Sequence, residues 1–150
     1  MTPDNTPISR QIRCNATELS VRKMLVKLRQ QYRDMGLNED TCSSVEIAVA
    51  EALNNIVGHA CANQPDAVIC LDLSRDATHV FVQVQDPGVA LPGWNLPEGR
   101  RPNLEVARDD LPEGGFGWGL IHMVSDRLGY SRIDGQNRLK MWIALHPNNA

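Results

Sequence analysis

The stretch 45–60, VEIAVAEALNNIVGHA, decides the fold and carries a dense set of polar side chains. At about 100° per residue, a helix places Glu51, Asn55 and His59 within one quadrant. The opposite side of that helix carries Val45, Val49, Ala52, Leu53, Ile56 and Ala60. The pattern therefore predicts a helix with an apolar back that packs on a core, and a front that presents an acid, an amide and an imidazole.

Glu51 and Asn55 are spaced i and i+4, so both side chains can serve one small volume. A carboxylate can accept a proton in a transition state, and an amide oxygen is a hard ligand that suits Mg²⁺. Polar residues are also common on surface helices, so the pair by itself is more typical of a solvated helix face. The pair indicates a reactive site only with support from elsewhere in the chain.

The composition predicts a single globular domain over residues 8–150, preceded by a flexible tail over residues 1–7 that holds two prolines. The chain has 150 residues, of which 42% are hydrophobic, and a formal net charge of −3. This balance gives no reason to expect a nucleic-acid or membrane partner. No apolar leader or spanning segment is present, so we expect a cytoplasmic protein.

The four cysteines are expected to be free thiols rather than metal ligands. They show no C-x-x-C pair and no histidine at zinc-ligand spacing. Their positions are Cys14, Cys42, Cys61 and Cys70.

Apolar periodicity predicts the order strand, helix, helix, strand, strand, loop, helix, strand, strand. The expected strands cover 8–14, 67–73, 79–85, 130–133 and 138–145, and the expected second helix covers about 39–60. The first helix is expected to have Asn15 as its N-cap, an apolar stripe and a stop at Gly36. That stripe comprises Leu19, Met24, Leu25 and Leu28. Asp134-Gly135 predicts the turn of the last hairpin.

Asp86-Pro87-Gly88 follows the third strand directly. A carboxylate at this place can accept a hydrogen bond from an exocyclic amine such as that of adenine, and a glycine leaves room for a flat ring. Pro-Gly is also favoured at the centre of a turn on conformational grounds alone. The motif therefore fits a ligand site and a plain turn equally well.

Residues 89–115 form a long loop rich in proline and glycine, with a helical pattern only at 103–107. A loop of this length inside a compact domain is usually functional or disordered. The run GFGWG at 115–119 closes the loop and opens a helix, which is expected to carry Leu128 on its apolar side and to stop at Gly129. Glycines before a helix expose backbone N–H groups at the positive end of the helix dipole, which is typical of a phosphate site. Glycines needed for flexibility or for close packing are the alternative.

In this order, the motifs resemble those of the GHKL ATP-binding superfamily: E-x-x-x-N on a helix, D-x-G after a strand, a lid-like loop over 89–115, and G-x-G-x-G-L opening a helix. The short length, the form AEALNNIVGHA and the C-terminal hairpin resemble the anti-sigma factor serine/threonine kinases of bacterial partner-switching systems. The resemblance covers about residues 8–145. It implies a two-layer α+β sandwich, in which helices cover one face of a mixed, mostly antiparallel sheet.

The resemblance also implies roles for individual residues. Asn55 would ligate Mg²⁺ that bridges the ATP phosphates, and Glu51 would take the proton of an attacking serine hydroxyl. Asp86 would bind the adenine amine, with Gly88 beneath the ring. The remaining cofactor-binding positions are Gly115, Gly117, Gly119 and Leu120, of which the glycines would hold the phosphates.

Two positions are less defined by the resemblance. His59 matches a position where the family frequently has histidine, with a structural role beside the site as one reading. Ala90 stands where the family often has the second glycine of D-x-G-x-G, and alanine fits there if its φ is negative.

The implied function is that of a kinase that phosphorylates a serine of an anti-sigma factor antagonist and otherwise sequesters a sigma factor, as a homodimer. Arg100 or Arg101 could reach the γ-phosphate or an acidic partner, although paired surface arginines are more often solvated. A non-catalytic, nucleotide-gated binding module is the first alternative. The catalytic domain of a histidine kinase and a non-nucleotide interaction domain of the same fold are the others, and the sequence has no dimerisation helix pair with a phosphoacceptor histidine.

Overall fold

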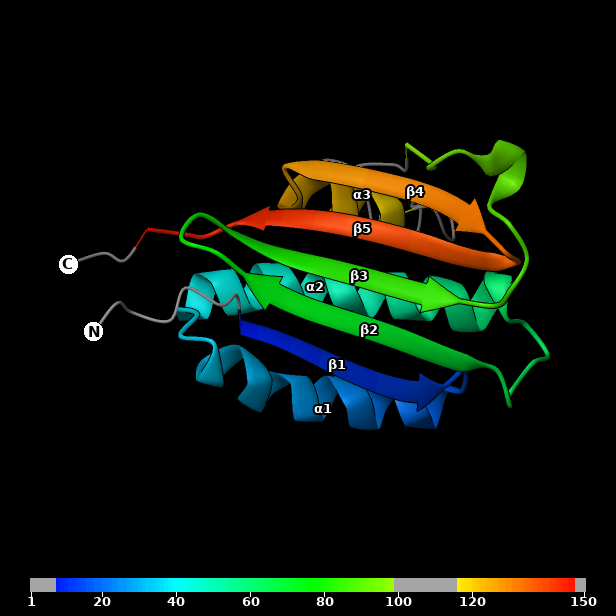
Figure 1. Cartoon of the computed structure of the whole chain (residues 1–150), viewed down its shortest axis with the longest axis horizontal. Helices are drawn as coiled ribbons and strands as arrows, with labels where there is room; N and C mark the ends of the chain where they lie inside the picture. Colours follow the sequence, from blue (N-terminus) through cyan, green and yellow to red (C-terminus); the bar gives the residue numbers. More distant parts are fainter. Residues whose placement is uncertain (1–7, 99–115, 148–150) are drawn as a thin grey trace, which may run out of the picture.

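The computed structural model describes residues 8–98 and 116–147 (Figure 1). These residues form two layers, a five-stranded sheet and helices that lie behind it in Figure 1. The strand order is β1-β2-β3-β5-β4, and each described pairing of neighbouring strands is antiparallel. The predicted α+β fold, with a mostly antiparallel sheet covered on one face, is confirmed.

The elements follow the chain in the predicted order. The first part comprises β1 (Ile8–Asn15), α1 (Glu18–Asp34), α2 (Glu39–Asn55), the π-helix η1 (Ile56–Ala60), β2 (Val68–Arg75) and β3 (His79–Asp86). The second part comprises the 3-10 helix η2 (Pro92–Trp94), α3 (Phe116–Val124), β4 (Arg127–Ile133) and β5 (Gln136–Ala144). The predicted tail, the helical pattern at 103–107, Arg100, Arg101 and Gly115 lie outside the described residues.

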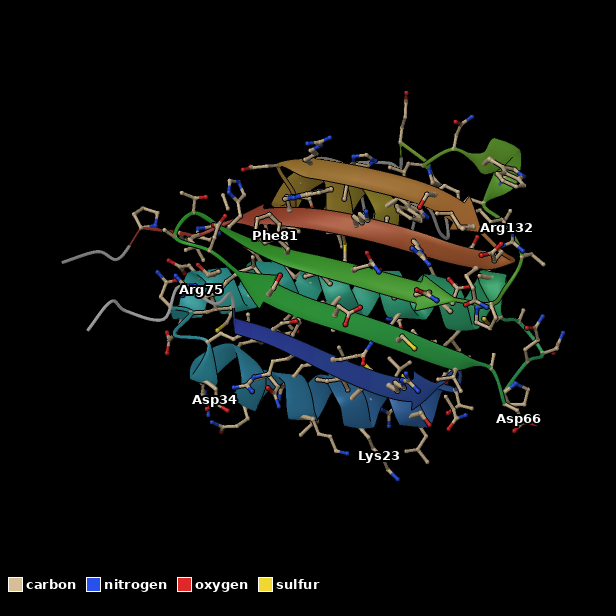
Figure 2. All side chains as sticks on the ribbon, in the orientation of Figure 1. Lys23, Asp34, Asp66, Arg75, Phe81 and Arg132 are labelled. Atoms are coloured by element: carbon tan, nitrogen blue, oxygen red, sulfur yellow. The ribbon has the colours of Figure 1, made fainter. Side chains whose placement is uncertain are left out.

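The core lies between the sheet and the helices. Alternate residues of β3 and β5 point into it, because successive side chains of a strand face opposite sides of a sheet. From the helices it receives the apolar back predicted for α2, including Val45, Val49 and Leu53, each with no exposed side-chain surface. The other sheet face is uncovered by the described helices, and Figure 2 shows Phe81 on it. The site described below lies at the edge of this core.

Helix α1 begins two residues later than the sequence predicted. Its N-cap is Thr17, whose hydroxyl accepts a hydrogen bond from the backbone N–H of Ser20 at 3.1 Å. The predicted cap Asn15 is still part of β1, where it pairs with Val68 of β2. Pairing in the sheet thus keeps Asn15 extended, and the next residue with a capping side chain takes its place.

The predicted apolar stripe of α1 was also wrong at one position. Met24 and Leu28 are buried as expected, but the side chain of Leu19 is 59% exposed. Leu28 follows Leu19 by nine positions, which puts the two about half a turn apart around the helix. The buried face continues instead through Val21 and Tyr32.

The boundary between α3 and β4 differs from the prediction. Leu128 and Gly129 were assigned to the helix and its stop, but α3 ends at Val124 and both residues belong to β4. The turn at Asp134-Gly135, with φ of 52° and 74°, sets the register of the hairpin. That register extends the pairing back to Arg127 opposite Trp142, so cross-strand hydrogen bonds override the helical pattern.

All four cysteines are free thiols. Burial raises the pKa of the Cys14 and Cys61 thiols to about 11 each. No helix within the described ranges is long and apolar enough to cross a membrane.

Two leucines of α1 test the assigned core. Leu28→Ala should lower the free energy of unfolding by about 2–5 kcal/mol, because it removes a fully buried side chain and leaves a cavity. Leu19→Ala, on the exposed side of the same helix, should change it by less than about 0.5 kcal/mol. Urea denaturation followed by circular dichroism measures both, and equal effects would contradict the assigned packing of α1.

Candidate functional site

A cavity of about 360 Å³ lies at the end of the sheet where β3 and β5 meet α2, η1 and α3. Its lining is mostly apolar, with a few polar side chains. It comprises Ala52, Asn55, Ile56, His59, Ala60, Asp86, Val89, Ala90, Leu91, Pro92, Pro97, Trp118, Tyr130, Asn137 and Leu139. The size and the small number of polar groups are typical of a site for a small organic ligand.

Asp86 is a buried acid in this cavity. Strand β3 alternates with Val80, Val82 and Val84 facing the core, and Asp86 follows on the same face with 4% of its surface exposed. Its Oδ1 accepts hydrogen bonds from the backbone N–H of Gly88 at 2.8 Å and from Asn137 Nδ2 at 3.1 Å. Among the described residues these bonds all go to Oδ1. The second oxygen is therefore available to a ligand.

The pKa of the Asp86 carboxyl is raised above its usual value, chiefly because burial removes water from the charged form. Hydrogen bonds from Asn137, the backbone of Gly88 and the Cys61 thiol act in the opposite direction, as does the charge of Arg132. The Cys61 sulfur lies 3.7 Å from Asp86 Oδ1. Burial thus destabilises the ionised form of Asp86, and the surrounding hydrogen-bond donors partly offset that effect.

Gly88 is required by a close approach of two backbone segments. A Cβ at this position would lie 2.2 Å from the carbonyl oxygen of Ala60, the last residue of η1. The neighbouring N–H of Val89 donates a hydrogen bond to the same oxygen at 2.8 Å. The sequence predicted a glycine that leaves room for a ligand ring, whereas the neighbour closest to its Cβ position is the backbone of Ala60.

Helix α2 brings Asn55 to the cavity. Asn55 is the last residue of α2 before the π-helical turn, and its Nδ2 is buried without a hydrogen-bond partner among the described residues. Buried amide groups without partners are rare in folded proteins. This orphaned donor at a cavity wall indicates a place where a polar ligand completes the bonding of the side chain.

Gly117 of α3 lies beside Glu51 and Asn55 of α2. A Cβ on Gly117 would lie 2.6 Å from Glu51 Oε2 and 3.8 Å from Asn55 Nδ2. Glu51, Asn55 and Gly117 are thus neighbours in space, although Gly117 follows Asn55 by 62 positions in the sequence. Glu51 is half-buried and does not line the cavity itself.

The other predicted positions are placed as follows. Gly119 is buried and Leu120 half-buried, and neither lines the cavity. His59 is exposed at the cavity wall. Ala90 also lines the cavity and is not among the described residues with positive φ, so alanine fits there without strain.

The sequence analysis missed Asn137 and Tyr130, which meet Asp86 and the cavity from the β4–β5 hairpin. A signal for Asn137 was present. Asn137 lies two residues before Leu139 in the alternation that buries Leu139, Met141 and Ile143. A polar residue in such a series faces the core and needs a partner. The register that sets it opposite Asp86 depends on pairing between distant strands.

Comparison with known families gives one match that covers most of the chain. Residues 14–143 match the model of the histidine kinase-like ATPase domain. A crystal structure of the RsbU and RsbW domains of a Mycobacterium tuberculosis protein superposes with a TM-score of 0.62 at 17% identity. That likeness covers 93% of this chain and 33% of the other, and it supports the fold.

Curated relatives are similar over shorter stretches. The serine/threonine-protein kinase BtrW of Bordetella bronchiseptica is 33% identical over 98 residues, which are 65% of this chain and 67% of the relative. The anti-sigma F factor of Geobacillus stearothermophilus is 25% identical over 89 residues, 59% of each chain. The match therefore spans somewhat more than half of the anti-sigma F factor.

Two glycines test the contact between β3 and η1. Gly88→Ala should lower the free energy of unfolding by about 1–3 kcal/mol or more, because backbone atoms must move to admit the methyl group. Gly58→Ala, in η1 with no atom within 4 Å of its Cβ position, should leave stability equal or slightly higher. Urea denaturation compares them, and a Gly88 variant as stable as the Gly58 variant would contradict the described contact.

Asp86→Asn tests the cost of the buried carboxylate. Because its pKa is higher in the folded chain than in the unfolded chain, folding takes up a proton between these two values, and stability falls as the pH rises through that interval. Because asparagine does not ionise, the variant does not lose stability in this way. It should be at least as stable as the parent at pH 7.5, and the difference between their free energies of unfolding should shrink toward pH 4. A variant that is clearly less stable at pH 7.5 in urea denaturation would disprove this reading.

Proposed function

The chain belongs to the histidine kinase-like ATPase domain family, and on that premise we propose that it is an ATP-dependent serine/threonine protein kinase and anti-sigma factor. It would bind ATP with Mg²⁺, phosphorylate a serine of an anti-sigma factor antagonist and sequester a sigma factor. The observation that carries the proposal is the buried carboxylate of Asp86, which faces an apolar cavity also lined by Asn55, whose Nδ2 has no hydrogen-bond partner among the described residues.

Adenine fits the chemistry of the cavity. The 6-amino group of adenine is a donor, and Asp86 offers an oxygen that is not used by the described residues. The apolar lining, which includes Ile56, Leu139 and the indole of Trp118, suits a flat aromatic base. The backbone N–H of Gly88 donates to the carboxylate at the end of β3, and the close contact of Gly88 with Ala60 fixes that backbone segment.

The residues at the start of α3 suit a magnesium-bound triphosphate. The Nδ2 of Asn55 has no described hydrogen-bond partner and could donate to a phosphate oxygen, whereas its Oδ1 is the type of oxygen that ligates Mg²⁺. Mg²⁺ bound with ATP would neutralise charge on the phosphates. We assign the phosphates to the N-terminal turn of α3 with Gly117, Gly119 and Leu120, and to Gly115 before it.

Glu51 is the proposed general base. In the transfer, the serine hydroxyl oxygen of the antagonist attacks the γ-phosphorus, the bond to the bridging oxygen breaks, and ADP leaves. The hydroxyl proton passes to the carboxylate of Glu51, which lies one helical turn from Asn55. A Cβ on Gly117 would lie 2.6 Å from Glu51 Oε2, so the glycine leaves room for that carboxylate beside the proposed phosphate site.

Regulation would follow from differential affinity. ATP would favour one of the two complexes, with the antagonist or with the sigma factor, and phosphorylation would release the other. We propose a homodimer that acts in the cytoplasm and has no direct contact with nucleic acid or membrane. Arg100 or Arg101 remains a proposed contact to the γ-phosphate or to an acidic partner.

The kinase is tested by incubating the protein with Mg²⁺, γ-labelled ATP and candidate antagonist proteins. Label should appear on a serine of one candidate. Asn55→Ala should abolish both labelling and magnesium-dependent ATP binding. Glu51→Gln should lower the transfer rate by about 10²–10⁴-fold while ATP binding stays within about twofold, because it removes only the base.

Equal loss of binding and transfer in Glu51→Gln would refute its assignment as base. ATP binding without label on any candidate would favour the non-catalytic, nucleotide-gated binding module. Absence of magnesium-dependent ATP binding in calorimetry would refute the proposed nucleotide site altogether.

A further inference from the structure

We propose that Asn137 and Tyr130 of the β4–β5 hairpin are positioning residues for the nucleotide: Asn137 fixes the carboxylate that reads the purine, and Tyr130 fixes the adjoining wall. The inference rests on the proposed function. It concerns a polar cluster, Asp86, Tyr130, Arg132 and Asn137, that ties the end of β3 and the chain after it to the hairpin.

Asn137 is the centre of this cluster. It is buried, and its Nδ2 faces the Oδ1 of Asp86 at 3.1 Å and the carbonyl oxygen of Val89 at 2.8 Å. Its Oδ1 accepts hydrogen bonds from the Tyr130 hydroxyl at 2.6 Å and from Arg132 Nη1 at 2.8 Å. Because hydrogen-bond donors face the amide oxygen and acceptors face the amide nitrogen, only one orientation of the Asn137 amide satisfies both.

Tyr130 connects this amide to the wall of the cavity. Its hydroxyl donates to Asn137 and accepts from the backbone N–H of Leu91 at 3.0 Å. Leu91 and Pro92 line the cavity. The hydroxyl thus holds the chain at a defined point where it leaves β3.

Arg132 supports the same turn from the end of β4, where Figure 2 labels it. Its Nη1 donates to the carbonyl oxygen of Gly88 at 2.8 Å and to Asn137 Oδ1. Asp86 Oδ1, Asn137 Oδ1 and the Gly88 carbonyl oxygen thus have hydrogen-bond partners within the cluster itself. The orientation of the Asp86 carboxylate is therefore set before a ligand enters. Such preorganisation lowers the cost of binding.

The charge state of Asp86 depends on the same contact. The Asn137 hydrogen bond favours the ionised carboxylate against the effect of burial. The other groups that influence it are the Cys61 thiol, at the end of η1, and the Arg132 guanidinium from β4.

An ionised carboxylate only accepts hydrogen bonds, so it pairs with the amine of adenine and repels the 6-oxo group of guanine. Asn137 therefore supports both the affinity for ATP and the preference for ATP over GTP.

Calorimetric titration with ATP and with GTP, each with Mg²⁺ and between pH 5.5 and 8, tests the proposal. Asn137→Asp keeps the shape of the side chain but places an acceptor against Asp86, which favours a shared proton. The ratio of ATP to GTP affinity should fall at least about tenfold at pH 7, and the acid limit of ATP binding should move to higher pH. Asn137→Ala removes the same donor without adding a charge and should shift both readouts in the same direction.

Tyr130→Phe should act differently, because it removes only the tether to Leu91 and one donor to Asn137 Oδ1. It should weaken ATP and GTP by the same factor, about fivefold, with an unchanged acid limit. Gln136→Ala is the matched control. Gln136 precedes Asn137 in β5, but its side chain bonds to Gln85 at 3.5 Å, and its loss should change neither affinity.

Circular dichroism of each variant verifies folding, and Asn137→Ala carries the test if Asn137→Asp fails to fold. An equal loss of ATP and GTP affinity in the folded Asn137 variants, with an unchanged pH limit, would overturn the positioning assignment. Tyr130→Phe binding as tightly as the parent would overturn the assignment of the wall. Failure of the parent protein to bind ATP would instead refute the proposed function, so the two failures are distinguishable.

Discussion

The contact between the end of β3 and the end of η1 is the constraint on which the site depends. The carbonyl oxygen of Ala60 accepts a hydrogen bond from Val89 and leaves no space for a side chain at Gly88. This contact joins the polar front of α2 to the end of the central strand. Asp86 and Asn55 can therefore line one cavity, although they are 31 positions apart along the chain.

Two polar side chains of the site lie in surroundings that are energetically unfavourable for them while no ligand is bound. Burial raises the pKa of Asp86, and Asn55 Nδ2 has no described hydrogen-bond partner. Both features cost stability in the free protein. Such features concentrate at functional sites, because a ligand that supplies the missing partners recovers the lost free energy on binding.

Much of this arrangement could be predicted from local patterns. Helical periodicity gave α2 its apolar back, and the order of elements followed from the alternation between periods of 3.6 and 2. The prediction failed where distant pairing decides the local structure, as at Asn15, which the sheet keeps extended, and at Leu128, which the hairpin register draws into β4. Asn137 escaped notice because its role depends on lying opposite Asp86, which only the pairing of β3 with β5 reveals.

The most direct test of the central claim is a ¹H–¹⁵N correlation spectrum of the protein titrated with ATP and Mg²⁺. The account predicts that the largest shifts fall on the side-chain amide of Asn55, the backbone N–H groups of Gly88 and Leu91, and the indole N–H of Trp118. Residues on the uncovered sheet face, such as Phe81, should stay unchanged. An unchanged spectrum at millimolar nucleotide, or shifts confined to that open face, would contradict it.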